Sequence, residues 1–270
     1  MFLLFLVLIL TLGYSLMFYF CINLSPWFMF LWVPVSLILA ALTFTLFVYI
    51  FLVIGYRTKP NHRFKHFILR SAMNLFLKFY HIKLNIVGEE NIPNDTYIVY
   101  SNHKSNMDPI FIYLASKSHN ITAIGKQTLF NNYFMNLIRG TYGAYSLNRE
   151  NDREAAKTII KAINDAKNGM SIIIFPEGGI KTRDVEEMVN LRAGAYKVAT
   201  KSGAKVLPCA IVGSSQIKTM KRRKKKEITV IFFKAIDKEE YKSMNTTNIG
   251  LMVEDIINDG IKNYGKNEQE

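Results

Sequence analysis

The first part of the chain is hydrophobic and contains no charged side chain. From Met1 to Tyr56 there is no Asp, Glu, Lys or Arg, and the two apolar runs are Met1–Ile22 and Trp27–Ile54. A helix of roughly 20 apolar residues crosses the hydrocarbon core of a bilayer, so each run is long enough. Asn23-Leu24-Ser25-Pro26 predicts a turn, because proline is barred from a helix interior but suits a helix start. The pattern therefore predicts a two-helix membrane hairpin over residues 1–56.

Two other interpretations of this apolar region stay open. A signal peptide is the alternative for the first run, and the absence of a basic residue before it argues against that alternative. Re-entrant insertion into one leaflet is the alternative to spanning, because Pro34 interrupts the second run. Trp27 and Trp32 flank the turn, where interfacial aromatic side chains are expected.

A basic segment follows the second apolar run directly. It contains Arg57, Lys59, Arg63, Lys65 and Arg70. Positive residues beside a membrane segment favour the cytoplasmic side, so the rest of the chain is expected on the cytoplasmic face of the cell membrane. Within residues 57–80, basic and apolar positions alternate at helical spacing, which predicts a basic amphipathic helix on the membrane interface. A helix that faces a protein core gives the same pattern.

Residues 81–270 alternate short β-rich runs with helical ones. Strands are expected at Lys83–Val87, Tyr97–Ser101, Ile121–Ile124, Ala144–Leu147, Ser171–Phe175, Lys205–Ile211 and Ile228–Phe233. Helices are expected at Pro109–Ser116, Asn131–Arg139, Arg153–Asn168, Leu191–Lys201 and Ile249–Ile261. This alternation predicts an α/β domain with a mixed, largely parallel central sheet flanked by helices. The run Ser171–Phe175 is apolar on both faces, as a central strand should be.

Composition narrows the choice of partners. All 34 basic and 21 acidic residues lie beyond Tyr56, so that part alone carries the net charge of +13. A basic domain beside a membrane segment favours anionic headgroups, phosphorylated substrates or an acidic carrier protein. No recognition motif for nucleic acid accompanies the charge, which argues against that partner. The two cysteines, Cys21 and Cys209, and the scattered histidines indicate neither a disulfide framework nor a metal site.

The strongest candidate for chemistry is Asn102-His103-Lys104-Ser105-Asn106-Met107-Asp108-Pro109, directly after an expected strand. A histidine held by a carboxylate can take a proton from an alcohol. On one helix the side chains of His103 and Asp108 would point about 140° apart, so they can meet only where a loop turns into a helix. Asp108 and Pro109 also fit an N-cap and a first helical position, and the two roles are compatible.

Three further segments are ambiguous when each is taken alone. Phe175-Pro176-Glu177-Gly178-Gly179 ends an apolar strand with a carboxylate and two glycines, which suits close approach to a ligand or a plain turn. Arg149 follows the strand at Ala144–Leu147 and suits a phosphate ligand or a solvated surface residue. The basic run Lys221–Lys226 suits a solvated hairpin turn, or binding to a membrane or an acidic carrier.

Together these segments resemble the 1-acylglycerol-3-phosphate (lysophosphatidic acid) acyltransferases of the glycerolipid acyltransferase superfamily. The first family motif is matched in full by Asn102, His103 and Asp108. In the second motif the arginine is matched by Arg149, whereas Asn148 replaces the family's aspartate.

The third motif of the family is matched in part. Phe175–Gly178 agree with it, Gly179 and Ile180 replace its Thr and Arg, and Lys181 and Arg183 are candidates to supply the lost charge. Weaker similarity comes from Val206-Leu207-Pro208, Arg192–Lys197 and Val87–Pro93, so the resemblance covers roughly residues 80–215.

The resemblance implies a glycerol-3-phosphate acyltransferase-like fold and an acyl transfer that needs no bound cofactor or metal. His103 would deprotonate the free hydroxyl of lysophosphatidic acid, and Asp108 would orient His103. The hydroxyl would attack an acyl thioester of coenzyme A or acyl-carrier protein, which would make phosphatidic acid. The residues implied in substrate binding are Asn102, Lys126, Arg149, Glu177, Gly178 and Gly179. A different acceptor (another lysolipid or glycerol 3-phosphate) and a non-catalytic lipid-binding scaffold stay open as alternatives.

Overall fold

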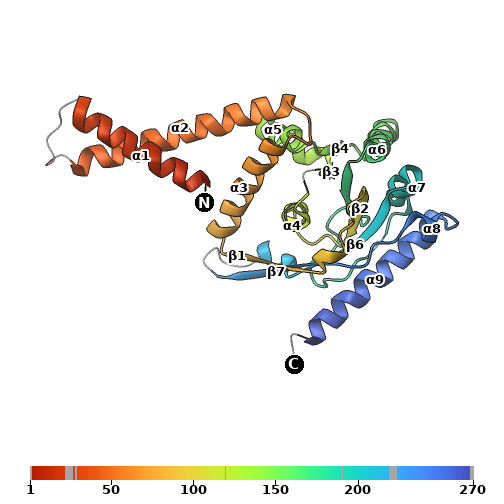
Figure 1. Ribbon diagram of the computed structural model, residues 1–270. Helices are drawn as coiled ribbons and strands as arrows, with labels where there is room; N and C mark the ends of the chain where they lie inside the picture. Colours follow the sequence, from red (N-terminus) through yellow and green to blue (C-terminus); the bar gives the residue numbers. More distant parts are fainter. Residues whose placement is uncertain are drawn as a thin grey trace.

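The computed structural model describes residues 2–21, 27, 29–118, 120–189, 191–218 and 224–267 (Figure 1). Its α-helices are α1 (Phe2–Cys21), α2 (Met29–Arg57), α3 (Arg63–Phe79), α4 (Asp108–Ser116), α5 (Tyr133–Tyr142), α6 (Asp152–Lys167), α7 (Lys197–Ser202), α8 (Lys238–Tyr241) and α9 (Thr246–Asn267). Its strands are β1 (Ile82–Val87), β2 (Tyr97–Ser101), β3 (Ile121–Lys126), β4 (Tyr145–Leu147), β5 (Ser171–Ile174), β6 (Lys205–Val212) and β7 (Lys226–Phe232). Short 3-10 helices are η2 (Glu89–Asn91), η3 (Gln127–Phe130), η4 (Ala193–Tyr196) and η5 (Ser214–Lys218).

The described strands form one sheet in the order β1-β7-β6-β2-β5-β3-β4. Neighbouring strands run parallel except β6 and β7, which are antiparallel. In the centre of the sheet, Ile98 of β2 lies between Ile172 of β5 and Val206 of β6. The expected mixed, largely parallel sheet with flanking helices is therefore confirmed.

The core lies on both faces of this sheet. Side chains alternate between the two faces of a strand, and in β2 both sets are buried. Ile98 and Tyr100 pack with residues of α6, α7 and α9. Tyr97 and Val99 pack with residues of α3 and α4 on the other face. Figure 1 accordingly shows α3 and α4 on one side of the sheet and α9 on the other.

The helix expected at Leu191–Lys201 begins later than the pattern predicts. Ala193–Tyr196 forms the 3-10 helix η4, and α7 covers Lys197–Ser202. The physical reason is a contact from outside the segment. The backbone of Arg192 is extended, and its N–H donates to the carbonyl oxygen of Pro176 at 3.0 Å. That bond holds Arg192 out of a helix.

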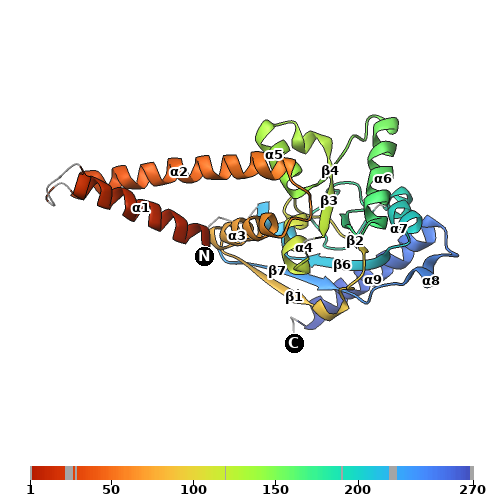
Figure 2. The same ribbon diagram turned by 45° about the horizontal axis from the view of Figure 1, so that its top comes forward.

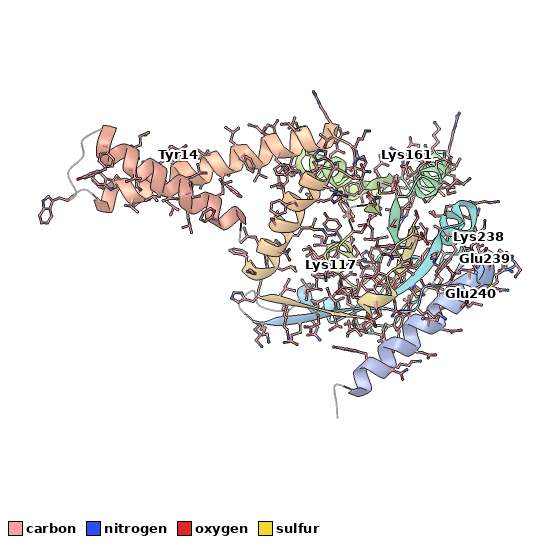
Figure 3. The ribbon with its side chains drawn as sticks, viewed as in Figure 1. Tyr14, Lys117, Lys161, Lys238, Glu239 and Glu240 are labelled. Carbon is pink, nitrogen blue, oxygen red and sulfur yellow. The ribbon has the colours of Figure 1, made fainter. Side chains whose placement is uncertain are left out.

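The apolar helices α1 and α2 lie side by side and extend away from the sheet (Figures 1 and 2). The hydroxyl groups of Tyr14, labelled in Figure 3, and Thr43 are 2.7 Å apart. Trp27 is exposed, but Trp32, expected with it at the membrane interface, is buried with its ring 6.3 Å from that of Tyr19. Helix α2 continues through Pro34 without a break.

The membrane hairpin itself stays a prediction. Among the described residues, one helix, Leu31–Arg57, is long and apolar enough to cross a membrane by length and composition. The apolar stretch Phe5–Phe20 of α1 is shorter and does not meet that length. The expected turn at Asn23–Pro26 lies outside the described residues.

Helix α3 joins the apolar helices to the α/β domain. Its Leu69 and Leu77 are buried in the core, so the core-facing interpretation of this segment is confirmed. His66 is also buried, with Nδ1 2.6 Å from the hydroxyl of Tyr113 and Nε2 2.6 Å from the carbonyl oxygen of Pro60. Phe64 is 61% exposed, and an additional interfacial role for α3 stays a prediction.

The basic run Lys221–Lys226 was expected as a hairpin turn or a binding segment, and its last residue, Lys226, is the first residue of strand β7, which pairs antiparallel with β6. Residues 221–223 lie outside the described residues. Lys226 does not belong to a solvated run, because it is buried and its Nζ donates to the carbonyl oxygen of Tyr80 at 3.2 Å.

Candidate active site

Four neighbouring parallel strands bring the candidate residues to one edge of the sheet. His103 follows β2, Gly178 follows β5, Lys126 ends β3 and Arg149 follows β4. Since the carboxyl ends of parallel strands lie at the same edge, these segments meet there. They line a pocket of about 490 Å³, together with Gly179. The other predicted site residues, Asn102, Asp108 and Glu177, are completely buried and do not line it.

His103 and Asp108 form a direct pair at the pocket wall. His103 Nδ1 lies 2.9 Å from Asp108 Oδ2, and the side chain of His103 is 14% exposed. The imidazole stacks on the ring of Phe175, with 4.2 Å between centroids and 22° between planes. A ring held by Nδ1 and by stacking leaves Nε2 as the nitrogen that can exchange a proton with a ligand in the pocket.

The carboxylate of Asp108 also shapes the loop that carries His103. Its Oδ2 accepts hydrogen bonds from the backbone N–H groups of Lys104 and Ser105, each at 2.7 Å. The expectation that Asp108 caps α4 is wrong, because Met107 is at the N-cap position and no side chain caps the helix. Asp108 turns toward the preceding loop, and this is what brings it to His103.

Asn102 ties the loop to two distant parts of the chain. Its Nδ2 donates to the carbonyl oxygens of Glu186 at 2.7 Å and Ile211 at 2.8 Å, and its Oδ1 accepts from the N–H of Ile211 at 2.8 Å. Both polar atoms of its side chain thus bind backbone groups, and Oδ1 also accepts from the hydroxyl of Ser101 at 3.2 Å. The geometry makes Asn102 a support for His103.

Glu177 supports the same loop together with a lysine that sequence reasoning missed. Glu177 Oε1 accepts the backbone N–H of His103 at 3.0 Å and lies 3.5 Å from Lys104 Nζ. Both side chains of this ion pair are completely buried. Burial raises the pKa of Glu177, while the charge of Lys104 and the N–H of His103 act in the opposite direction. Nothing in the sequence distinguishes Lys104 from the many other basic residues of this domain, because its burial arises only in the folded chain.

Two guanidinium groups lie beside the glycine turn that follows β5. Gly178 has φ of 73°, and a Cβ atom there would lie 2.5 Å from Arg192 Nε. Gly179 has φ of 139°, and a Cβ atom there would lie 3.6 Å from Arg149 Nη1. Both arginines line the pocket with Lys126, and Asp152 is the acidic residue of the described lining. Gly178 therefore makes room for the side chain of Arg192 at the turn.

The two guanidinium groups together bring positive charge to the pocket, which suits an anion. Burial lowers the pKa of Arg149, and the positive charge of Arg192 lowers it further. Arginine nevertheless stays protonated in proteins, so two like charges face one pocket and favour an anion between them. Sequence reasoning did not single out Arg192, which begins the segment Arg192–Lys197 that gave only weaker similarity to the family.

The residues expected to replace the missing arginine of the third motif do not do so. Neither Lys181 nor Arg183 lines the pocket. Arg183 Nε instead donates to the carbonyl oxygen of Lys104 at 3.1 Å. Arg192 supplies the second guanidinium group in their place.

The rest of the pocket wall is largely apolar. It is formed by side chains that include Leu129, Leu147, Ile159, Ile174 and Ile180. Such a wall suits a hydrocarbon chain beside the polar end of the pocket. Over the described ranges, His, Cys, Asp and Glu side chains form no group of three or more that could hold a metal ion.

The sequence and fold place this site in a known family. The acyltransferase family model matches residues 83–212, which contain His103, Asp108, Arg149 and Arg192. These residues therefore form a domain of the acyltransferase family. This acyltransferase domain is similar to the 1-acyl-sn-glycerol-3-phosphate acyltransferase of Borreliella burgdorferi, with 34% identity over 57% of this chain and 60% of that protein. It is also similar to a probable 1-acyl-sn-glycerol-3-phosphate acyltransferase of Mycoplasma genitalium, with 29% identity over 76% of this chain and 79% of that protein.

The fold of the acyltransferase domain also occurs in a crystal structure. The 1-acyl-sn-glycerophosphate acyltransferase of Thermotoga maritima superposes with a TM-score of 0.63. The match covers 82% of this chain and 89% of that one, at 20% sequence identity. At this identity the likeness concerns the architecture, which agrees with the layered α/β sheet described above.

Proposed function

We propose that this chain is a 1-acylglycerol-3-phosphate O-acyltransferase that makes phosphatidic acid. The observation that carries the proposal is the placement of the His103–Asp108 pair and the Arg149–Arg192 pair in one pocket. A base and an anion site that line one pocket suit an acceptor with a hydroxyl and a phosphate. The names of the Borreliella and Mycoplasma relatives support this choice of acceptor.

In the proposed reaction, His103 Nε2 takes the proton of the free hydroxyl of lysophosphatidic acid. The hydroxyl oxygen attacks the carbonyl carbon of an acyl thioester, and the C–S bond then breaks. The thiolate leaves and takes up the proton from His103, which returns to its starting state. Asp108 holds Nδ1 and stabilises the protonated imidazole during the attack. Gly178 N–H is already donated to the carbonyl oxygen of Phe175 at 3.1 Å, so other N–H groups would meet the oxyanion.

The membrane supplies the acceptor in this proposal. Helix α2 would anchor the chain in the bilayer, and the basic residues after it favour the cytoplasmic face. The apolar wall at Leu129 and Ile180 would take the acyl chain. The donor would be a thioester of coenzyme A or acyl-carrier protein, and the basic domain suits the acidic groups of both.

The function is tested by acyl transfer from labelled donors to a panel of acceptors. We expect the purified chain to convert lysophosphatidic acid to phosphatidic acid much faster than it acylates lysophosphatidylcholine. The phosphate of lysophosphatidylcholine is esterified to a cationic choline group, which the two arginines would repel. Separate reactions with acyl coenzyme A and acyl-carrier protein identify the donor. Acylation of glycerol 3-phosphate alone would contradict the proposed acceptor. No acylation of any acceptor would instead favour a lipid-binding scaffold.

Substitution of the arginine pair tests how the acceptor is held. We expect Arg149→Ala and Arg192→Ala each to raise the KM for lysophosphatidic acid about 10- to 100-fold, because each removes hydrogen bonds to a charged group. The kcat should change less. Arg153→Ala removes an exposed guanidinium group outside the pocket lining and serves as the matched control. An unaltered KM in both pocket variants would contradict the anion site.

A further inference from the structure

A second cavity, the junction cavity, lies where the end of α2 meets the acyltransferase domain. Its volume is about 610 Å³, and its lining begins at Tyr56 near the end of α2. The remaining lining comes from the segment after α2, from β3 and β4, and from α5 and α6 with the residues that follow them. No residue that lines it also lines the pocket at His103. The two cavities are therefore separate sites.

Positive charge predominates in the junction cavity. Its lining includes the cations Lys59, Arg139 and Lys161 and one carboxylate, Asp165. Among the described residues, no Asp or Glu forms a salt bridge with any of the three cations. Asp165 Oδ2 accepts a hydrogen bond from the hydroxyl of Tyr145 at 2.8 Å. The positive charge of Lys59, Arg139 and Lys161 is therefore available to an anion that enters the cavity.

The arginine of this cavity is held in place. Arg139 Nε donates to Asn136 Oδ1 at 2.9 Å, and its Nη1 donates to the carbonyl oxygen of Ala144 at 3.3 Å. Lys59 and Lys161 are exposed, one on the segment after α2 and the other on α6, where Figure 3 labels it. A guanidinium group held by hydrogen bonds, together with two exposed ammonium groups, suits phosphate oxygens.

A buried hydroxyl in the lining also lacks a partner. Thr122 on β3 is 1% exposed and lines the junction cavity. Its Oγ1 has no hydrogen-bond partner within the part of the chain that the structure describes. Buried polar atoms in folded proteins are nearly always paired. A ligand with hydrogen-bonding oxygens would supply the missing partner.

The position of the junction cavity identifies the source of the anion. The cavity begins at the residues that end and follow α2, the helix long and apolar enough to cross a membrane. These residues lie where a spanning helix leaves the hydrocarbon core, at the level of lipid phosphates. Ile54, one turn before the end of α2, is 57% exposed and offers apolar surface for an acyl chain. We propose that the junction cavity binds the phosphate of an anionic membrane phospholipid, separately from the acyl-transfer pocket.

Lipid retention by the full chain tests this site without reference to acyl transfer. The purified protein in zwitterionic detergent is titrated with phosphatidylglycerol, and bound lipid is measured by native mass spectrometry. We expect Lys59→Glu with Lys161→Glu to weaken retention about tenfold or more, because two attractive charges become repulsive. We expect Thr122→Val, which keeps the shape of the side chain, also to weaken it.

The matched control reverses two charges that lie outside the cavity. Lys157→Glu with Lys167→Glu changes the net charge equally on exposed positions of α6 and should leave retention unchanged. Equal weakening in both double variants would overturn the site in favour of general surface charge. Retention of phosphatidylcholine equal to that of phosphatidylglycerol would overturn the assignment to an anionic phospholipid. Displacement of the lipid by an equal concentration of inorganic phosphate would overturn it too. Retained thermal stability of each variant shows that it is folded.

Discussion

His103→Ala is expected to lower the kcat of acyl transfer by about 10²- to 10⁴-fold, the usual contribution of a positioned general base. The imidazole of His103 is the proposed general base at the pocket wall, and the substitution removes it without filling the pocket. The thermal midpoint should change little, because the side chain is partly exposed and its loop is held by Asn102 and Glu177. The measurement is the initial rate with saturating lysophosphatidic acid and acyl donor.

The control for this variant is His62→Ala, which removes an exposed histidine from the segment before α3. Its rate should equal that of the unaltered chain. Membrane association of both variants should be the same, since neither change touches α1 or α2. Full turnover in His103→Ala would exclude the proposed mechanism, whatever the acceptor proves to be.

Asp108→Asn is expected to give a loss of similar size, on the order of 10²- to 10⁴-fold in kcat. The amide keeps the shape of the side chain but removes the negative charge that stabilises a protonated imidazole. It also disturbs the tautomer of His103, because an amide nitrogen in place of Oδ2 would present a donor to Nδ1. The KM for lysophosphatidic acid should change little, since Asp108 does not line the pocket.

Asp108→Asn can also change the conformation of the loop, because Asp108 Oδ2 accepts hydrogen bonds from two backbone N–H groups of that loop. Thermal unfolding of Asp108→Asn therefore accompanies the kinetics. Asp255→Asn, an exposed change on α9 across the sheet, is the matched control. A folded Asp108→Asn protein with unaltered kcat would remove Asp108 from the mechanism and leave His103 to act alone.

The pairing of His103 with Asp108 was predictable, because it depends on a short stretch of chain. An apolar strand followed by a polar loop and a helix start brings both residues to the end of β2. The meeting of that loop with the segments after β3, β4 and β5 was predictable for a similar reason. Alternating strands and helices favour a parallel sheet, and a parallel sheet gathers its carboxyl ends at one edge.

The roles of the buried polar residues were not predictable in this way. Asn102 was expected to bind substrate, but it bonds to Ile211, which is 109 positions away along the chain. Glu177 was expected in the pocket wall, but it pairs with Lys104 beneath it. Whether a polar side chain faces a ligand or the interior depends on such distant partners, which no local pattern reveals.

The sequence by itself determined the apolar segment, the order of strands and helices, and the motif that carries His103 and Asp108. These features follow from hydrophobic periodicity and local spacing, which act within a few residues of each position. Only the tertiary structure decided that Arg192 stands beside Arg149, that Lys104 is buried, and that a cationic cavity opens beside α2. The reason is that charge and hydrogen bonding are satisfied between segments, and the packing of the sheet and its helices decides which segments meet.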